Sequence, residues 1–292
     1  RYVSCNRKGK LGAAGLGLGA LAAYLDATGD RSFLDPTLEL LRHVDGQMFP
    51  SGELQGYWVH PDHEAGRPLE APSDDVRRAV FSFHYPGQAL FGMAKSLTLL
   101  PLAPGERDYL RARVLLGLDY LWQRRPVEYA HLYSPLPSDP WLLRAIEWLV
   151  VEAGVRSEAA VSLARKDSVQ LACRMYREDA PYPDYEGGFF YNHGDKAYLD
   201  GARVEAMLAA YRIAQAVGDR TWADTLRAGC VSATRALLRL FNTEHHAYVF
   251  PAPLDAISTF RMKLTRHWVR LDGTAHAYGS LASSLDLGLA PR

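Results

Sequence analysis

Three polar side chains near the C-terminus have the types and the spacing that proton transfer on an anionic ligand requires. Asp272 and His276 are four residues apart, so they share a face if the segment is helical, and Arg270 stands just before them. A carboxylate and an imidazole exchange protons near neutral pH, and a guanidinium can hold a substrate carboxylate. Capping explains Asp272 alone, but not all three, and a purely structural network is the alternative.

The segment 183–193 is a second concentration of chemically useful side chains, with two acids, four aromatic residues and a histidine. Aromatic rings supply platforms for the apolar faces of sugars, and carboxylates accept hydrogen bonds from hydroxyls or act as acid and base. We therefore expect Tyr185 to take part in catalysis and Asp184, Glu186 and Tyr191 to bind substrate. A loop with only a structural role is the alternative.

Two further groups come directly before expected helices and carry a proline at the first helical turn. The first is His84-Tyr85-Pro86 and the second is Asp139-Pro140-Trp141. We expect Asp139 to be catalytic and His84, Tyr85 and Trp141 to bind substrate. A helix cap is the alternative role for Asp139.

A fifth group lies at the start of another expected helix, in Asp200-Gly201-Ala202-Arg203-Val204-Glu205. Arg203 and Glu205 are two residues apart and do not share a helical face, whereas Asp200 and Arg203 do. Charges at the top of an otherwise apolar helix need partners or water, which favours a wet cavity. We expect Glu205 to be catalytic and Arg203 to bind substrate, and a local Asp200–Arg203 ion pair is the alternative.

The charge balance excludes several classes of partner. Lys and Arg number 33 and so do Asp and Glu, so no long-range field favours nucleic acid or an anionic membrane surface. The longest apolar run, from Leu11 to Leu25, falls short of the ~20 residues that a spanning helix needs. We expect a buried helix there, and no nucleic-acid or membrane partner.

Metal and disulfide chemistry are not indicated either. The three cysteines, Cys5, Cys173 and Cys230, are isolated and odd in number, which favours small buried side chains in a reducing compartment. His245 and His246 are adjacent and face apart, so they make a poor pair of zinc ligands. We expect no metal, no cofactor and a cytoplasmic location. The chain begins without methionine, so we also expect it to be part of a longer protein.

A recurring turn pattern predicts the elements that position these groups. Glycine followed directly by an acid occurs at Gly29-Asp30, Gly105-Glu106 and Gly218-Asp219, and a degenerate copy lies at Gly154. Each glycine follows an apolar stretch and precedes an amphipathic one. This is typical of a tight turn between helices, with glycine in the left-handed conformation and an acid at the start of the next helix.

Four helical hairpins follow from these turns. The first helix of each pair is apolar around most of its circumference and the second has a charged face, so the pairs form inner and outer helices. We therefore predict an all-α fold, an (α/α) toroid in a single domain over residues 1–292, whose long polar connections meet at one mouth. The expected helices are 12–28 with 31–44, 86–99 with 107–123, 139–153 with 157–177, 201–217 with 220–241, and an unpaired ninth at 273–286.

The segments 83–90, 138–145, 202–210 and 269–277 look like the inner-helix starts of bacterial six-hairpin toroid proteins. They resemble the catalytic domain of D-glucuronyl C5-epimerases and, more distantly, unsaturated glucuronyl hydrolases and N-acylglucosamine 2-epimerases. The resemblance implies action on hexose or uronic-acid units in the toroid mouth, without a covalently held organic cofactor. Six hairpins need twelve helices and nine are expected here, so the ring is incomplete or completed by upstream residues. Tyr185, Glu186 and Tyr191 are stand-ins for an epimerase's tyrosine and glutamate pair.

We therefore expect a carbohydrate-active enzyme, an epimerase or a glycoside hydrolase, that acts by acid-base chemistry on a small-molecule or oligosaccharide substrate. The first alternative is a non-catalytic toroid that binds a glycan or a protein. The second is a lanthionine-synthetase-like cyclase, which the missing zinc cysteines count against. The sequence leaves the substrate and the oligomeric state open.

Overall fold

The protein is described by a computed structural model that covers residues 4–5, 8–59, 83–131, 136–191, 194–198 and 200–290. It is an all-α protein, as predicted, and the strands among its described residues are short and antiparallel. The chain divides into two compact units, Arg1–Ala164 and Arg165–Arg292.

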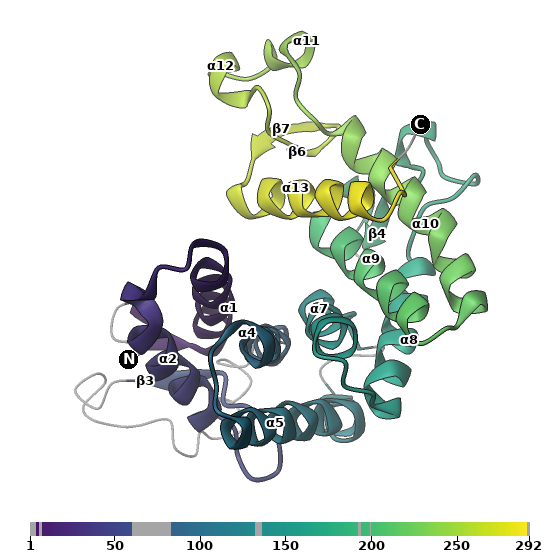
Figure 1. The fold of residues 1–292 in the computed structure, drawn as a ribbon. Coiled ribbons are helices and arrows are strands. Elements are labelled where there is room, and N and C mark those ends of the chain that lie inside the picture. The colour runs from purple at the N-terminus through teal and green to yellow at the C-terminus, as the bar shows by residue number, and fades with distance from the viewer. Residues whose placement is uncertain are drawn as a thin grey trace. The chain divides into compact units, whose positions relative to one another are not determined.

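The first unit is built on the two inner helices of its first two predicted hairpins. α1 and α4 lie side by side (Figure 1) and pack backbone to backbone. A Cβ on Gly15 would lie 2.5 Å from the Ala89 Cα, and one on Gly92 would lie 2.2 Å from the Gly15 carbonyl oxygen. Only glycine permits this approach. Among the described residues of this unit, the helices are α1 (Leu11–Thr28), α2 (Leu34–Gly46), α4 (Tyr85–Leu99), α5 (Pro104–Gln123), α6 (Arg125–Glu128) and α7 (Pro140–Glu147), with a π-helical turn at Trp148–Glu152.

α1 is also long and apolar enough to cross a membrane by length and composition alone. The face that contains Leu11, Ala14, Leu18 and Ala22 is buried in the unit. This burial agrees with the predicted core helix. A three-stranded antiparallel sheet has the order β1 (Ser4–Cys5), β2 (Lys8–Lys10) and β3 (Tyr57–Val59). β1 and β2 come before α1 in the chain, and β3 comes after α2.

The predicted helix turns are confirmed at three of four positions. Gly29, Gly154 and Gly218 have φ of 69°, 65° and 76°, in the left-handed region. The carboxylates of Asp30 and Asp219 accept the backbone N–H groups of Ser32 and Trp222 at 2.9 Å, which caps the next helix in each case.

The prediction for Gly105 is wrong. Gly105 lies inside the first turn of α5, and its φ is not positive. The chain reverses before it, because Pro104 occupies the first helical position. The Glu106 carboxylate reaches back to accept the Ala103 N–H at 2.9 Å, so the acid keeps the capping role that the pattern gave it.

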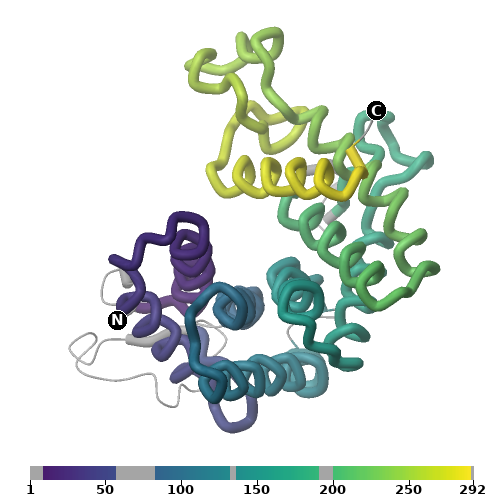
Figure 2. The backbone as a smooth tube through the Cα atoms, in the orientation of Figure 1, coloured from purple at the N-terminus to yellow at the C-terminus, as the bar shows by residue number. Residues whose placement is uncertain are grey.

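The second unit is a bundle of three long helices, α9, α10 and α13, whose backbones run close together in Figure 2. Most residues of α9 are buried, whereas α10 has one buried face, as predicted for inner and outer helices. Among the described residues, the helices of this unit are α9 (Gly201–Ala216), α10 (Arg220–Arg239), α11 (Glu244–Ala247), α12 (Pro253–Ala256) and α13 (Leu271–Asp286), and α8 (Glu158–Ala172) spans the boundary between the two units.

Two antiparallel hairpins occupy the long connections of this unit. β4 (Phe189–Tyr191) pairs with β5 (Gly194–Tyr198), and β6 (Arg261–Lys263) pairs with β7 (Arg266–Val269). The sequence did not indicate these strands, because each is short. Three predicted helix pairs, α1 with α2, α4 with α5 and α9 with α10, are observed within the units. The pair predicted at 139–153 and 157–177 crosses the boundary between the units and stays a prediction. The closed ring, its common mouth and the single domain depend on how the units are arranged, and they stay predictions.

Candidate acid-base site

The start of α9 packs directly against α13, and this contact positions the best-defined candidate site. A Cβ on Gly201 would lie 2.4 Å from the Ala277 N and 2.5 Å from the His276 carbonyl carbon, so only glycine fits at this crossing. The Ser280 hydroxyl donates to the Gly201 carbonyl at 2.8 Å. The first turn of α9 is thereby fixed against the second turn of α13.

This crossing brings together two of the predicted catalytic residues, Glu205 and His276. His276 Nδ1 lies 2.8 Å from Glu205 Oε2, and the side chains are 23% and 11% exposed. An imidazole whose Nδ1–H donates to a carboxylate has its tautomer fixed, with the lone pair on Nε2. In this arrangement Nε2 of His276 can act as a general base, and the Glu205 carboxylate can stabilise the protonated ring.

Gly279 makes room for the Glu205 carboxylate. A Cβ at this position would lie 2.1 Å from Glu205 Oε1, well inside van der Waals contact. Gly279 is three residues beyond His276 on α13, so it lies on the same side of that helix. A larger residue here would displace the carboxylate.

The predicted partnership of Asp272 with His276 is not the pairing that the structure shows. Asp272 instead accepts two hydrogen bonds from Arg270, from Nε at 2.9 Å and Nη2 at 2.5 Å. Because Arg270 is only two residues away and outside the helix, its guanidinium reaches the carboxylate edge-on. The hydrogen bond from Arg270 holds the pKa of Asp272 below its ordinary value, against a smaller opposing effect of burial.

Asp200 and Arg203 form the local ion pair that was the alternative for this segment. Arg203 Nε lies 3.2 Å from Asp200 Oδ2, and the same carboxylate caps α9 by accepting the Arg203 N–H at 3.3 Å. The Arg203 guanidinium also lies 5.6 Å from the centroid of the Phe189 ring. The charge of Arg203 is therefore already balanced inside the unit.

The first unit contains a separate cluster around Asp139, whose carboxylate is fully buried. Arg125 Nη1 lies 3.0 Å from Asp139 Oδ2, and His84 Nδ1 lies 3.5 Å from Asp139 Oδ1. The carboxylate also accepts the Leu142 N–H at 3.2 Å, so it caps α7 as the alternative reading of Asp139 had it. The imidazole of His84 is 44% exposed, so a buried charge pair connects here to an accessible titratable group.

Burial on its own would raise the pKa of Asp139. The hydrogen bond from His84 and the charge of Arg125 outweigh that effect and lower the pKa below its ordinary value. Asp139 is therefore ionised at neutral pH and does not supply a proton.

Next to this cluster, the predicted binding residue Trp141 contacts Phe91, with ring centroids 5.6 Å apart, and the Tyr85 ring lies against Gly12 of α1.

The predicted residues of 183–191 occupy a turn on the second unit. The Tyr185 ring is buried between Tyr176 and Tyr182, with centroids 5.4 and 5.2 Å away, which favours a packing role. Asp184 and Glu186 are exposed, and their carbonyls accept hydrogen bonds from Arg239 Nη1. The Tyr191 side chain, like His193, lies outside the described residues.

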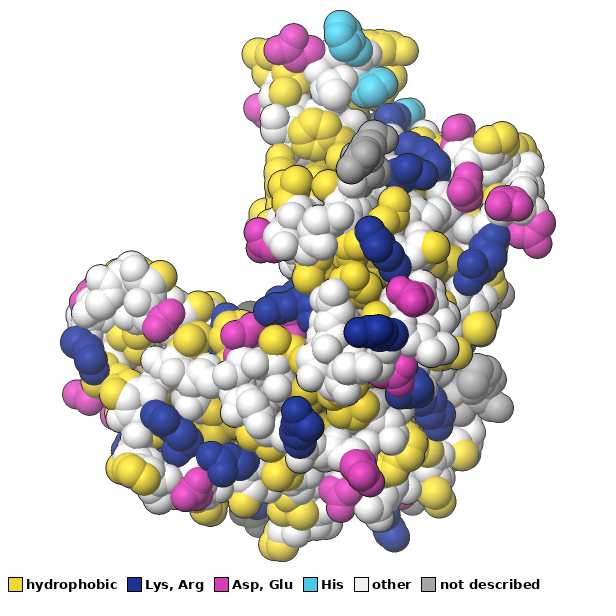
Figure 3. All heavy atoms as spheres, turned by 45° about the vertical axis from the view of Figure 1, so that its right-hand side comes forward, with side chains coloured by type: hydrophobic (Ala, Val, Ile, Leu, Met, Phe, Trp, Pro, Cys, Tyr) yellow, Lys and Arg dark blue, Asp and Glu magenta, His cyan; other side chains and the backbone are white. Residues whose placement is uncertain are grey.

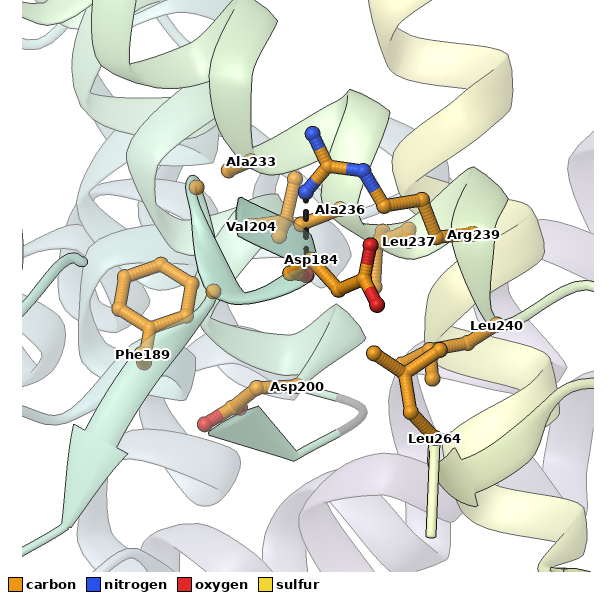
Figure 4. A pocket seen from close by; sticks show the side chains of 12 residues that line it. Asp184, Phe189, Asp200, Val204, Ala233, Ala236, Leu237, Arg239, Leu240 and Leu264 are labelled. Carbon is orange, nitrogen blue, oxygen red and sulfur yellow. Dashed lines mark hydrogen bonds between the residues drawn. The ribbon is translucent and has the colours of Figure 1, made fainter. Parts of the chain in front are cut away.

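A pocket beside this turn is lined by Asp184, Asp200, Arg239 and several leucines (Figure 4). Its cavity volume of about 20 Å³ is near the minimum for a single water, so it does not hold a sugar ring. Figure 4 also shows that the two carboxylates point in different directions. The pocket therefore does not offer a pair of acids facing one substrate atom.

Sequence reasoning missed Arg125 and Gly279. Arg125 is 3% exposed, and its guanidinium lies 4.2 Å from the Phe83 ring centroid and donates to the Phe83 carbonyl at 3.2 Å. The sequence signal for Arg125 was an arginine followed by proline just after an amphipathic helix, which has many explanations. Gly279 lies in an ordinary helical segment, and no local pattern distinguishes it. In the described part of the chain, no three His, Cys, Asp or Glu side chains gather as a metal site would need.

No protein-family model matches the chain, and no curated protein matches it by sequence. Among solved structures, it is similar to the crystal structure of a sugar epimerase from a ruminal bacterium, with a TM-score of 0.59 and 11% sequence identity. The match covers 97% of this chain and 74% of that chain. At this identity the likeness concerns the fold, and the chain thus has a helical fold like that of a sugar epimerase.

Proposed function

We propose that this protein is a carbohydrate-active enzyme that epimerises a sugar, with His276 as the proton-transferring group and Glu205 as the residue that orients it. The observation that carries the proposal is the 2.8 Å contact between His276 Nδ1 and Glu205 Oε2. With Nδ1–H donating to the carboxylate, the lone pair of the ring lies on Nε2, and we assign the proton exchange with substrate to that atom. The likeness to a sugar epimerase in fold supports the reading as an analogy.

Epimerisation fits this pair because it needs proton transfer and no net oxidation. His276 Nε2 takes the proton from the carbon next to a carbonyl, and the electron pair of the C–H bond moves into an enediolate. Water delivers a proton to the opposite face of that carbon, which gives the epimer, and the imidazolium returns its proton to the resulting hydroxide so that the net change is zero. The Glu205 carboxylate stabilises the imidazolium that exists between the two steps.

The charges near the pair favour a neutral hexose unit over a uronic acid. Both arginines expected to hold a substrate carboxylate are already paired, Arg203 with Asp200 and Arg270 with Asp272. Breaking the Arg203–Asp200 pair, whose side chains are 14% and 11% exposed, to bind an anionic sugar would leave a mostly buried aspartate without its partner, which costs free energy. A neutral sugar hydroxyl can instead bond to the outer edges of these pairs.

Glycoside hydrolysis is less well supported. It requires two carboxyl groups roughly 5–10 Å apart across the scissile bond, one of them protonated. Glu205 is bound to His276, and Asp184 and Asp200 point in different directions in Figure 4. Asp139 and Asp272 both have lowered pKa values, so neither serves as the acid.

The test is isotope incorporation from solvent. The purified chain is incubated in heavy water with a panel of neutral hexoses, their oligosaccharides and uronic-acid oligosaccharides, and the products are analysed by NMR and mass spectrometry. We expect deuterium at the epimerised carbon of a neutral sugar. Binding without deuterium uptake would contradict the proposal and support the non-catalytic alternative.

A matched pair of histidine variants assigns the chemistry to a residue. His276→Gln should lower the rate of deuterium uptake by roughly 10²-fold or more, as loss of a general base does. His245→Gln replaces an exposed histidine on α11 and should leave the rate unchanged. Equal rates for both variants would reject His276 as the proton-transferring group.

A further inference from the structure

The β6–β7 hairpin exposes a large flat aromatic side chain. All four residues of β7 are exposed, and the indole of Trp268 is 52% exposed. The Arg266 guanidinium lies over this ring, 5.3 Å from its centroid. Figure 3 shows hydrophobic side chains on the surface of the segment that carries α11, α12 and this hairpin. An exposed tryptophan stiffened by a neighbouring cation is more typical of a binding surface than of a solvated strand.

The hairpin is held firmly to the helix that carries His276. Phe260, at the base of β6, is fully buried and contacts Phe241 and Tyr278, with ring centroids 5.1 and 5.5 Å away. The Tyr278 hydroxyl, on α13, donates to the Ser258 carbonyl at 2.6 Å. Since Arg261 pairs with Val269 across the hairpin, the anchoring of β6 also fixes β7. Trp268 therefore has a defined position relative to α13.

Trp268 also lies close to His276 along the chain. β7 ends at Val269 and α13 begins at Leu271, so three steps of extended chain and five residues of helix separate the two side chains. This limits the distance between their Cα atoms to roughly 18 Å. A short oligosaccharide can bridge such a distance, whereas a single sugar ring cannot.

The Arg270–Asp272 pair lies between them in sequence and supplies polar contacts. Both side chains are more than half exposed, and each remains ionised because the other shifts its pKa away from neutrality. The outer atoms of such a planar pair donate to and accept from adjacent sugar hydroxyls. An aromatic face beside paired hydrogen-bonding groups is the combination that a neutral sugar ring needs.

We propose that Trp268 is a stacking platform for one ring of a neutral oligosaccharide, with Arg270 and Asp272 bonding its hydroxyls while another ring reaches His276. The substrate class is therefore an oligosaccharide of hexose units rather than a monosaccharide. This inference rests on the proposed function for the role of His276, but the platform itself is a binding site that can be measured without turnover.

Binding by the complete chain tests the platform. Isothermal titration is carried out with α-1,4- and β-1,4-linked glucose and mannose tetrasaccharides and with the corresponding monosaccharides. We expect a tetrasaccharide to bind more tightly than its monosaccharide. Trp268→Ala should weaken that tetrasaccharide by roughly fivefold to tenfold, and Trp268→Phe should retain most of the affinity. Leu254→Ala removes another exposed apolar side chain of the same segment and should have no effect.

The outcomes separate this inference from the proposed function. Tetrasaccharide binding that depends on Trp268 but gives no deuterium uptake keeps the platform and removes the epimerase. Deuterium uptake on a tetrasaccharide with an unchanged KM in Trp268→Ala keeps the epimerase and overturns the platform. Absence of tetrasaccharide binding by the unmodified chain, or equal affinity for monosaccharide and tetrasaccharide, also overturns the platform.

Discussion

Substituting Gly279 by alanine probes the acid-base pair without touching either of its members. The new Cβ would lie 2.1 Å from Glu205 Oε1, and an ordinary contact needs about 3.4 Å, so the carboxylate must retreat by about 1.3 Å. The colliding atom is the end of a flexible side chain rather than backbone, which lets the fold survive. A displacement of that size is enough to break the 2.8 Å hydrogen bond to His276.

The expected effects on stability and activity are of different size. Loss of a hydrogen bond to a charged group costs about 1.5–3 kcal/mol, and replacing glycine by alanine inside a helix recovers about 1 kcal/mol. The free energy of unfolding should therefore fall by only about 0.5–2 kcal/mol. Misplacing the group that orients a catalytic base by about 1 Å should lower kcat/KM by about 10²-fold.

Kinetics of deuterium uptake and chemical denaturation measure the two quantities on the same samples. Gly46→Ala is the control, because Gly46 ends α2 in the first unit and nothing lies within 4 Å of its added Cβ. Gly279→Ala with full activity and an intact Glu205–His276 contact in its crystal structure would refute the reasoning. A loss of folding as large as the loss of activity would refute it as well.

Two further predictions concern groups outside this pair. Asp139→Asn should destabilise the protein by about 3–5 kcal/mol in chemical denaturation, because it leaves the buried Arg125 charge without its partner; an unchanged midpoint would contradict this. The folded-state pKa of Asp139 is lowered from 3.8, so the contribution of its ionised carboxylate to the free energy of unfolding is complete above that value. This contribution is lost as the pH falls through the lower folded-state pKa. The stability difference between the native protein and the variant should therefore shrink in acid. Burial raises the pKa of the Cys230 thiol to about 12, so iodoacetamide at pH 8 should alkylate the exposed Cys173 and spare Cys230 until the protein is unfolded; equal labelling in peptide mass spectrometry would contradict that burial.

The helices could be predicted from the sequence because their ends depend on neighbouring residues. Gly29 and Gly218 adopt the left-handed conformation and the acids after them cap the next helix, all within four residues. Gly105 shows the limit of this reasoning, because Pro104 started the helix one residue before it. A strong local signal was overridden there by a stronger one.

The candidate site could be predicted in part only, because its pairings join distant segments. Glu205 and His276 were both expected to be catalytic, but they are 71 residues apart and nothing in either segment indicates the other. Helical spacing suggested Asp272 as the partner of His276, but the Asp272 carboxylate accepts hydrogen bonds from the nearer Arg270 instead. The Arg125–Asp139 pair likewise depends on the path of the connection between α5 and α7, which sequence periodicity does not describe.

The coupling between Glu205 and His276 is the central claim, and a double-mutant cycle measures it most directly. The rate of deuterium uptake is compared for the unmodified chain, Glu205→Gln, His276→Gln and the double variant. If Glu205 acts only by orienting His276, the double variant should be no slower than His276→Gln alone. Multiplication of the two single effects would contradict the account, since the residues would then act independently.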